Sequence, residues 1–337
     1  MAKRFELTGV TGADCLRLAD APSATLGARQ VRIRVRATSL NYRDLMIANG
    51  ALPGVKLPVV PLSDGAGEII EVGAEVKRVK TGDRVMGIFM PNWIDGRPTV
   101  EKRRVSLGGP VDGMLAEEVV LDAEAVTPIP AHLSYEEAAT LPCAAVTAWS
   151  ALFEAGGLRA GDTALFLGTG GVSIFGMQLA QAAGARAIVT SSSDAKLERA
   201  KALGAWATIN YKTDPDWGKT ARGLTGGDGV DHVLEIGGAG TLAGTLNAVR
   251  LGGHVALIGA RSGDSGEMNR GMVQGKNLRV TGIGVGSRAM FEAMNRLIVN
   301  AGIKPVIDKV YDFADSLDAY RDFAKAGHFG KVVIRIP

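Results

Sequence analysis

The sequence predicts an α/β protein in which a doubly wound parallel sheet follows a smaller domain built from β-strands. The 337 residues divide into two parts with different sequence patterns. Up to about residue 125 the chain consists of short strand-like segments between turn residues, and after about residue 145 strands alternate with helices. A chain of this length suggests about two domains at roughly 150 residues each.

The first pattern is clearest in "QVRIRVRAT", residues 30–38, where apolar and basic residues alternate as in a half-buried strand. Similar segments occupy 65–73, 82–90 and 116–122, and Gly, Pro and Asp separate them. Strands at this spacing are typical of a barrel or a sandwich.

The second pattern predicts six strands joined by crossovers, an arrangement typical of a doubly wound parallel sheet. Between the strands lie helices such as 194–204, for which Asp194 is the expected N-cap and Gly204 the C-terminal stop. A further helix (289–302) and strand (330–336) exceed a six-strand sheet, so the tail is expected to return to the first domain. The expected domains are 1–125, 126–285 and the returning segment 286–337. The six strands are expected at 163–168, 186–191, 207–210, 231–237, 254–259 and 279–284.

Composition excludes several classes of function. The net charge of +3 is small and no basic stripe with aromatic residues occurs, so nucleic-acid binding is not expected. Two cysteines exclude a disulfide framework, and the N-terminal segment lacks the apolar stretch of a signal peptide. The apolar window 138–153 is short for a membrane span and contains a proline. A cytoplasmic protein that acts on a small molecule, without a membrane or nucleic-acid partner, is expected.

A glycine-rich loop follows the first strand of the predicted sheet, in "ALFLGTGGVSIFG" at residues 164–176. In the dinucleotide fingerprint G-x-G-x-x-G, the first glycine makes the turn and the second lets the backbone approach the pyrophosphate, while the third permits close packing. Here Ser173 stands at the third position and is small enough to pack there. The alternative is that this loop, like 237–243 and 282–287, is only a tight turn. The expected contacts are Gly168, Thr169, Gly170, Gly171 and Val172.

The end of the second strand predicts which nicotinamide cofactor binds. NAD sites place an acidic residue there for the ribose hydroxyls, whereas this chain has Ser191, Ser192 and then Ser193. Hydroxyl groups with Lys196 and Tyr211 nearby suit a 2′-phosphate, which a carboxylate would repel. The carboxylate of Asp194, which follows Ser193 in the sequence, argues against a 2′-phosphate site. The sequence therefore predicts NADP(H) rather than NAD(H).

Several motifs together resemble the medium-chain dehydrogenase/reductase superfamily, close to its quinone oxidoreductase-like branch. They include "SLNYRDLMIANG" (39–50), "GAGEIIEVGAEVKRVKTGDRV" (65–85), "AATLPCAAVTAWSAL" (138–152) and "GHFGKVVI" (327–334). The resemblance implies a GroES-like barrel domain, a Rossmann domain, an active site in the cleft, and a homodimer or homotetramer. It also implies further cofactor contacts, although Phe329 could instead be a core aromatic and Lys331 a surface residue. These contacts are Thr147, Gly237, Gly259, Ile283, Phe329 and Lys331.

Zinc enzymes of this superfamily carry a Cys where this chain has Asn41 and a Gly-His-Glu where it has Leu62-Ser63-Asp64; only Cys143 matches a ligand position. An amide, a hydroxyl and one thiolate make a poor zinc site, and none of the four histidines matches a ligand position. No metal is therefore expected.

Without zinc, reduction of a quinone or a conjugated double bond or carbonyl demands less than alcohol oxidation, because hydrogen-bond donors can stabilise the developing oxyanion. The candidate donors are Asn41, Tyr42 and Ser63, whereas Asp44 is expected to be a structural ion-pair partner. Two alternatives stay open: an NADP-dependent alcohol or aldehyde dehydrogenase, and an NADPH-binding protein without turnover.

Overall fold

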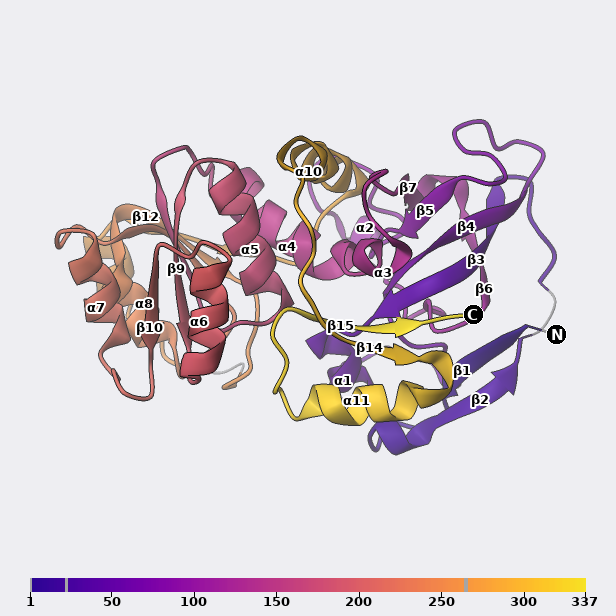
Figure 1. Cartoon of the computed structure of the whole chain (residues 1–337), viewed down its shortest axis with the longest axis horizontal. Coiled ribbons are helices and arrows are strands. Elements are labelled where there is room, and N and C mark those ends of the chain that lie inside the picture. The colour runs from indigo at the N-terminus through magenta and orange to yellow at the C-terminus, as the bar shows by residue number, and fades with distance from the viewer. Residues whose placement is uncertain (1, 22–23, 264–265) are drawn as a thin grey trace. The chain divides into compact units, whose positions relative to one another are not determined.

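The computed structural model describes residues 2–21, 24–263 and 266–337, and these form two compact units. Unit 1 contains the chain up to Val146 together with Gly286–Pro337, and unit 2 contains Thr147–Val285. In Figure 1 the yellow C-terminal strands of unit 1 lie beside its indigo N-terminal strands. Segment 126–146, which the sequence places in the second domain, belongs to unit 1 because its first strand pairs with a strand of that unit.

Unit 1 is organised around a mostly antiparallel sheet of seven strands with the order β14-β15-β3-β4-β5-β7, while β6 pairs with β3. A separate two-stranded ribbon joins β1 to β2. The N-terminal half of β3 pairs with β6, and its C-terminal end pairs with β15. The strands are β1 (Lys3–Leu7), β2 (Leu16–Asp20), β3 (Gln30–Ser39), β4 (Asp64–Val72), β5 (Arg84–Gly87), β6 (Glu118–Asp122), β7 (Val126–Pro128), β14 (Ile307–Asp312) and β15 (Lys331–Arg335).

The alternating residues of β3 explain its place at the centre of this sheet. Val31, Ile33 and Val35 are buried, while the basic residues between them are more exposed. In the register with β15, Ser39 lies opposite Val333. Because these strands are antiparallel, residues that follow β3 come to lie beside the first residues of β15, and Leu40 N donates to Val332 O at 3.1 Å.

The helices of unit 1 are short, except for two in the returning tail. The two longer helices of the tail are α10 (Arg288–Ala301) and α11 (Ser316–Ala324), and the short ones are α1 (Tyr42–Ala48), α2 (Val100–Arg103) and α3 (Tyr135–Ala138). Single 3-10 turns occur at Ala13–Cys15, Ala123–Ala125 and Phe313–Asp315. A wide π-helical turn, Leu141–Ala145, leads into α4 (Val146–Trp149), in which unit 2 begins at Thr147. A second π-helical segment, Ser150–Ala155, follows in unit 2. Aromatic and aliphatic side chains from α11, β1, β3 and β15 share one core cluster.

Unit 2 is a six-stranded parallel sheet with the order β10-β9-β8-β11-β12-β13, which confirms the doubly wound α/β prediction. The strand order reverses between β8 and β11, and in such sheets ligands bind at the carboxyl ends of the strands next to this switch. Figure 1 shows α5 and α6 side by side over the sheet. The elements are β8 (Thr163–Phe166), α5 (Gly171–Ala182), β9 (Arg186–Ser191), α6 (Asp194–Ala202), β10 (Ala207–Asn210), α7 (Trp217–Leu224), β11 (Val230–Glu235), α8 (Leu242–Ala248), β12 (Val249–Leu257), α9 (Arg270–Gly275) and β13 (Arg279–Gly282).

The start of α6 differs from the prediction. Ser193, not Asp194, is the N-cap, and its hydroxyl accepts from Lys196 N at 3.5 Å. Asp194 is instead the first helical residue, where a carboxylate interacts favourably with the helix dipole. Serine and aspartate are comparably good N-cap residues, and the extended backbone of Ser193 makes it the cap.

Candidate active site

The glycine loop in unit 2 connects β8 to α5. Gly168 has a φ of 71°, in the left-handed region that favours glycine, so the chain can turn sharply after the strand. Gly170 is the N-cap of the 12-residue helix α5 and has no side chain to cap the helix. A Cβ at Gly170 would meet no described atom within 4 Å. The protein's own packing therefore does not require glycine at this helix N-terminus, whereas the approach of a bound pyrophosphate would.

Two residues of α5 share the packing role of the missing third glycine. Ser173 is fully buried, and its hydroxyl donates to Leu167 O at 2.6 Å, which ties the first turn of the helix to the end of β8. One turn later, a Cβ at Gly176 would lie 2.5 Å from Phe166 Cε1. The position that needs glycine for close helix–strand packing is thus Gly176, which the fingerprint does not include.

The ends of β9 and β10 bring the predicted 2′-phosphate residues together. Ser191 O accepts from Tyr211 N at 3.1 Å, and Ser191 Oγ accepts from Ser193 N at 3.2 Å. Ser192 lies between the two serines, and Lys196 is in the first turn of α6. The carboxylate of Asp194 accepts from Asn210 Nδ2 at 2.7 Å.

A buried carboxylate that the sequence did not single out organises the neighbouring strand end. Glu235, the last residue of β11, is 1% exposed. Its Oε1 accepts from Gly237 N at 2.7 Å, Gly238 N at 3.0 Å and Thr241 Oγ1 at 2.6 Å, while Oε2 accepts from Thr245 Oγ1. An acidic residue at the end of an apolar strand, separated by one isoleucine from a glycine pair, was the available signal. Glu235 therefore holds the loop that contains the predicted cofactor contact Gly237.

The other predicted cofactor contacts of unit 2 follow neighbouring strand ends. Gly259 N donates to Glu235 O at 3.3 Å, and Ile283 N donates to Leu257 O at 2.9 Å, so both lie at the carboxyl edge of the sheet with Gly168. Thr147, the first residue of unit 2, is 4% exposed. Their contacts with a nicotinamide cofactor stay predictions.

In unit 1, Asn41 is the N-cap of α1, directly after β3. Its backbone N–H donates to Asp44 Oδ2 at 2.7 Å, and its side chain is buried. Asp44 also lies 3.4 Å from Arg43 Nη1. Burial raises the pKa of Asp44 to about 6, and the Arg43 guanidinium opposes that rise. Asp44 therefore has a structural role at the start of this helix, as an acceptor and ion-pair partner.

Ser63 does not present its hydroxyl freely, since Ser63 Oγ donates to Asp64 Oδ1 at 2.8 Å. The other oxygen, Asp64 Oδ2, accepts from Cys143 N at 3.3 Å and Ser39 Oγ at 3.4 Å. Both Ser63 and Asp64 are fully buried. A role for Ser63 as a donor to substrate would require this hydrogen bond to break.

Lys331 completes this cluster. Its ammonium group is buried and donates to Leu40 O at 2.6 Å and to Asn41 Oδ1 at 2.7 Å, and it lies 3.9 Å from Asp64 Oδ2. Burial lowers the pKa of Lys331, and the Asp64 carboxylate opposes that change. The alternative that Lys331 is a surface residue is wrong, because β15 is an interior strand of the sheet between β14 and β3.

The two remaining predicted residues of unit 1 have different environments. Tyr42, the first residue of α1, is 43% exposed. Phe329 is fully buried, in agreement with the alternative of a core aromatic. Its predicted contact with a cofactor stays a prediction.

A catalytic zinc ion, which this type of fold often holds, does not fit these residues. Of the three ligand positions, Asn41 accepts from an ammonium group and Ser63 donates to Asp64. At the third position Cys143 offers one thiol, and one thiolate with an amide and a hydroxyl falls short of the three ligands that a catalytic zinc ion needs. Within the described residues there is no group of three or more His, Cys, Asp or Glu side chains placed to hold a metal.

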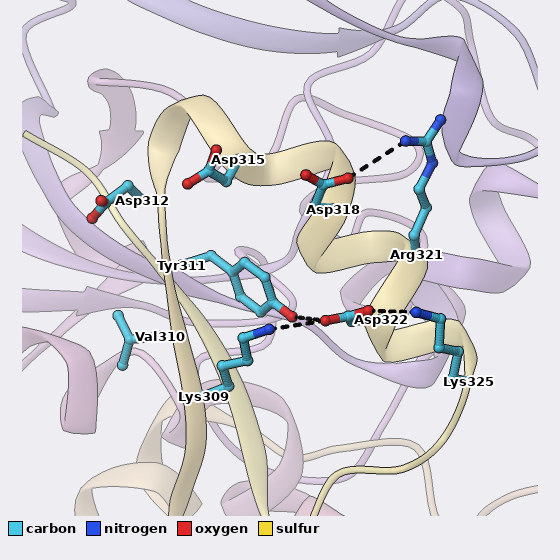
Figure 2. A pocket seen from close by; sticks show the side chains of 9 residues that line it. All are labelled: Lys309, Val310, Tyr311, Asp312, Asp315, Asp318, Arg321, Asp322 and Lys325. Atoms are coloured by element: carbon cyan, nitrogen blue, oxygen red, sulfur yellow. Dashed lines mark hydrogen bonds and ion pairs between the residues drawn. The ribbon is translucent and has the colours of Figure 1, made fainter.

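A separate hollow in unit 1, of about 600 Å³, lies between β14 and α11 (Figure 2). Asp322 is central to it and pairs with Lys309 at 2.9 Å and Lys325 at 2.7 Å, while Tyr311 Oη also donates to it. Figure 2 shows these side chains directed toward one another across the hollow. They satisfy each other, so the cluster is a surface ion-pair network and is not included in the candidate active site.

Two family models match the chain. The alcohol dehydrogenase GroES-like domain matches residues 27–131, and the zinc-binding dehydrogenase model matches residues 171–300. A zinc-type alcohol dehydrogenase-like protein of Schizosaccharomyces pombe is 45% identical over 314 residues, which cover 91% of each chain. A quinone oxidoreductase of Pseudomonas aeruginosa is 31% identical over 99% of each chain.

A crystal structure from Sinorhizobium meliloti, provisionally described as an alcohol dehydrogenase, superposes with a TM-score of 0.92 at 41% identity and covers 99% of each chain. The fold and these similarities define a nicotinamide-dependent oxidoreductase. The chain belongs to the medium-chain dehydrogenase/reductase superfamily, with a GroES-like unit and a Rossmann-like parallel sheet. None of the helices in the described parts of the chain has the length and apolar character needed to cross a membrane.

Proposed function

We propose that this protein is an NADP(H)-dependent oxidoreductase that transfers hydride to a quinone or to a conjugated C=C or carbonyl substrate without zinc. The observation that carries the proposal is the buried ammonium of Lys331, which is bonded to Asn41 and paired with Asp64 at the positions where zinc enzymes of the superfamily hold the metal. A fixed positive charge among these residues disfavours a divalent cation, because like charges in a buried site repel strongly.

The bound nicotinamide would supply the hydride, and the protein would supply placement and electrostatics. As hydride reaches an electron-poor carbon, negative charge builds on a carbonyl oxygen of the substrate. Donors that are already oriented toward that oxygen stabilise the charge. The buried Asn41 amide suits this role better than Ser63, whose hydroxyl donates to Asp64. The Tyr42 side chain is exposed, so substrate or cofactor can reach it.

Preference for NADPH is supported by the hydroxyl groups at the end of β9. Ser191 and Ser193 are held together there, with Tyr211 attached through its backbone, and Lys196 is in the first turn of α6. The carboxylate of Asp194 has Asn210 as a hydrogen-bond partner. A 2′-phosphate would therefore meet donors and a cation rather than an unpaired carboxylate.

A second candidate is an NADP-dependent dehydrogenase of alcohols or aldehydes. Two similar proteins, from Schizosaccharomyces pombe and Sinorhizobium meliloti, are described as alcohol dehydrogenase-like or as an alcohol dehydrogenase, which favours this candidate. An NADPH-binding protein without turnover is the third possibility. That the protein is cytoplasmic and forms a homodimer or homotetramer stays a prediction. Light scattering of the purified protein would test the oligomeric state.

One set of assays separates these functions. NADPH oxidation is measured with quinones, enones and enoyl thioesters, and NADP⁺ reduction with primary and secondary alcohols. We expect turnover only in the first set and a lower KM for NADPH than for NADH. Turnover confined to alcohols would support the second candidate, and cofactor binding without any turnover the third. Stoichiometric zinc in the purified protein, or equal KM values for the two cofactors, would contradict the corresponding part of the proposal.

A further inference from the structure

The amide group of Asn41 has only one of its two ends satisfied. Its Oδ1 accepts from Lys331 Nζ at 2.7 Å. Its Nδ2 is buried and has no hydrogen-bond partner among the described residues, although Asn41 is only 8% exposed. An unsatisfied buried donor costs about 1–3 kcal/mol, so natural proteins rarely keep one without a function.

Lys331 determines which end of the amide is left unsatisfied. An ammonium group has three donors and no acceptor, so only the carbonyl oxygen of the amide can face it. Of the three donors, one is used on Leu40 O and one on Asn41 Oδ1. Asp64, which also lies within ion-pair distance, holds the ammonium in place. The amide therefore has a single orientation, with its NH₂ group on the side away from Lys331.

The same contact strengthens the donor. Positive charge at the oxygen end of an amide withdraws electron density from its nitrogen, and hydrogen bonds in a buried chain polarise one another. Asn41 Nδ2 thus combines fixed direction, low solvent exposure and increased acidity of its N–H groups. These are the properties of a donor that stabilises an oxyanion.

We propose that Lys331 is a positioning residue that orients and polarises the Asn41 amide, whose NH₂ group donates to the carbonyl oxygen of the substrate. This inference rests on the proposed function and assigns the substrate class by chemistry: a ligand whose oxygen accepts at Asn41 and gains charge during hydride transfer. Lys331 itself does not touch the substrate. Its contribution passes through Asn41.

A double-mutant cycle tests the coupling between the two residues. Asn41→Ala is expected to lower kcat for NADPH oxidation with 2-cyclohexen-1-one or p-benzoquinone by about 100-fold, the usual loss for one oxyanion donor. Lys331→Met should lower kcat by about 10-fold or more alone but by less than about threefold in the Asn41→Ala background, with KM for NADPH nearly unchanged. Lys80→Met, which removes an exposed lysine of the same unit, is the matched control and should leave kcat unchanged. Equal losses from Lys331→Met in both backgrounds would show a purely structural role and overturn the inference.

A second measurement needs neither turnover nor a variant at Lys331. The side-chain ¹⁵N–¹H resonances of Asn41 are assigned from their loss in Asn41→Asp, and wild-type protein is then titrated with 2-cyclohexen-1-one in the presence of NADP⁺. Downfield movement of the Asn41 NH₂ resonances is expected, and unchanged resonances at saturation would overturn the inference. Absence of turnover on the whole substrate panel would instead defeat the proposed function, while the resonances still decide the role of Asn41.

Discussion

Glu235 allows a stability prediction whose size follows from its hydrogen bonds. Its carboxylate is 1% exposed and accepts from two backbone N–H groups and two hydroxyls in the loop and helix that follow β11. A hydrogen bond to a charged acceptor contributes about 1.5–3 kcal/mol, and the orphaned N–H groups would add a desolvation cost. Because the hydroxyls can turn to other partners, the two N–H groups dominate, and Glu235→Ala should destabilise unit 2 by about 3–5 kcal/mol.

Glu235→Gln is the matched control for this prediction. The retained Oε1 can still accept from Gly237 N, Gly238 N and Thr241, while the new amide NH₂ takes the place of Oε2 and can donate to the Thr245 hydroxyl. Its cost should be about 1 kcal/mol, for the lost charge assistance.

Urea unfolding followed by circular dichroism, and thermal melting, measure both variants. At about 2–4 °C per kcal/mol for a unit of this size, Glu235→Ala should melt roughly 10 °C lower than wild type and Glu235→Gln only a few degrees lower. If the loop also contacts the cofactor, KM for NADPH should rise in Glu235→Ala more than in Glu235→Gln. Equal stability losses in the two variants would refute the argument, because they would show that negative charge, and not acceptor geometry, holds the loop.

Two further predictions concern the packing and the acid stability of unit 2. Gly176→Ala should destabilise unit 2 by about 1–3 kcal/mol, because its Cβ would lie 2.5 Å from Phe166 Cε1. The control is Gly223→Ala in α7, whose Cβ would meet nothing within 4 Å and which should be neutral or stabilising. Equal melting temperatures of the two variants would contradict this prediction. His254 is fully buried, and desolvation, assisted by His232, lowers its pKa from 6.5 to about 4. Because the unfolded chain then binds the proton first, the free energy of unfolding should fall as pH drops from about 6.5 toward 4, by about 3 kcal/mol for a pKa shift of that size. His254→Leu should flatten this part of the curve of unfolding free energy against pH, and an unchanged slope would exclude His254 as its source.

The strands of the second unit and their doubly wound arrangement could be predicted from the sequence because their signals are local. Apolar runs that end in glycine, followed by helical periodicity, mark each βα unit, and parallel strands joined by crossovers leave few possible arrangements. The boundary between the units was less accessible. Segment 126–146 is as apolar as the chain that follows it, and only the pairing of β7 with β5 shows that it belongs to unit 1.

The same distinction between local and long-range information applies to the candidate site. The sequence by itself determined the glycine loop, the serines after β9 and the absence of the usual zinc ligands at Asn41 and Ser63, because each is a statement about residue type at a local position. Only the tertiary structure decided what those residues do with their hydrogen bonds. Lys331 reaches Asn41 across 290 positions of sequence because β15 pairs with β3, and no local pattern encodes that register.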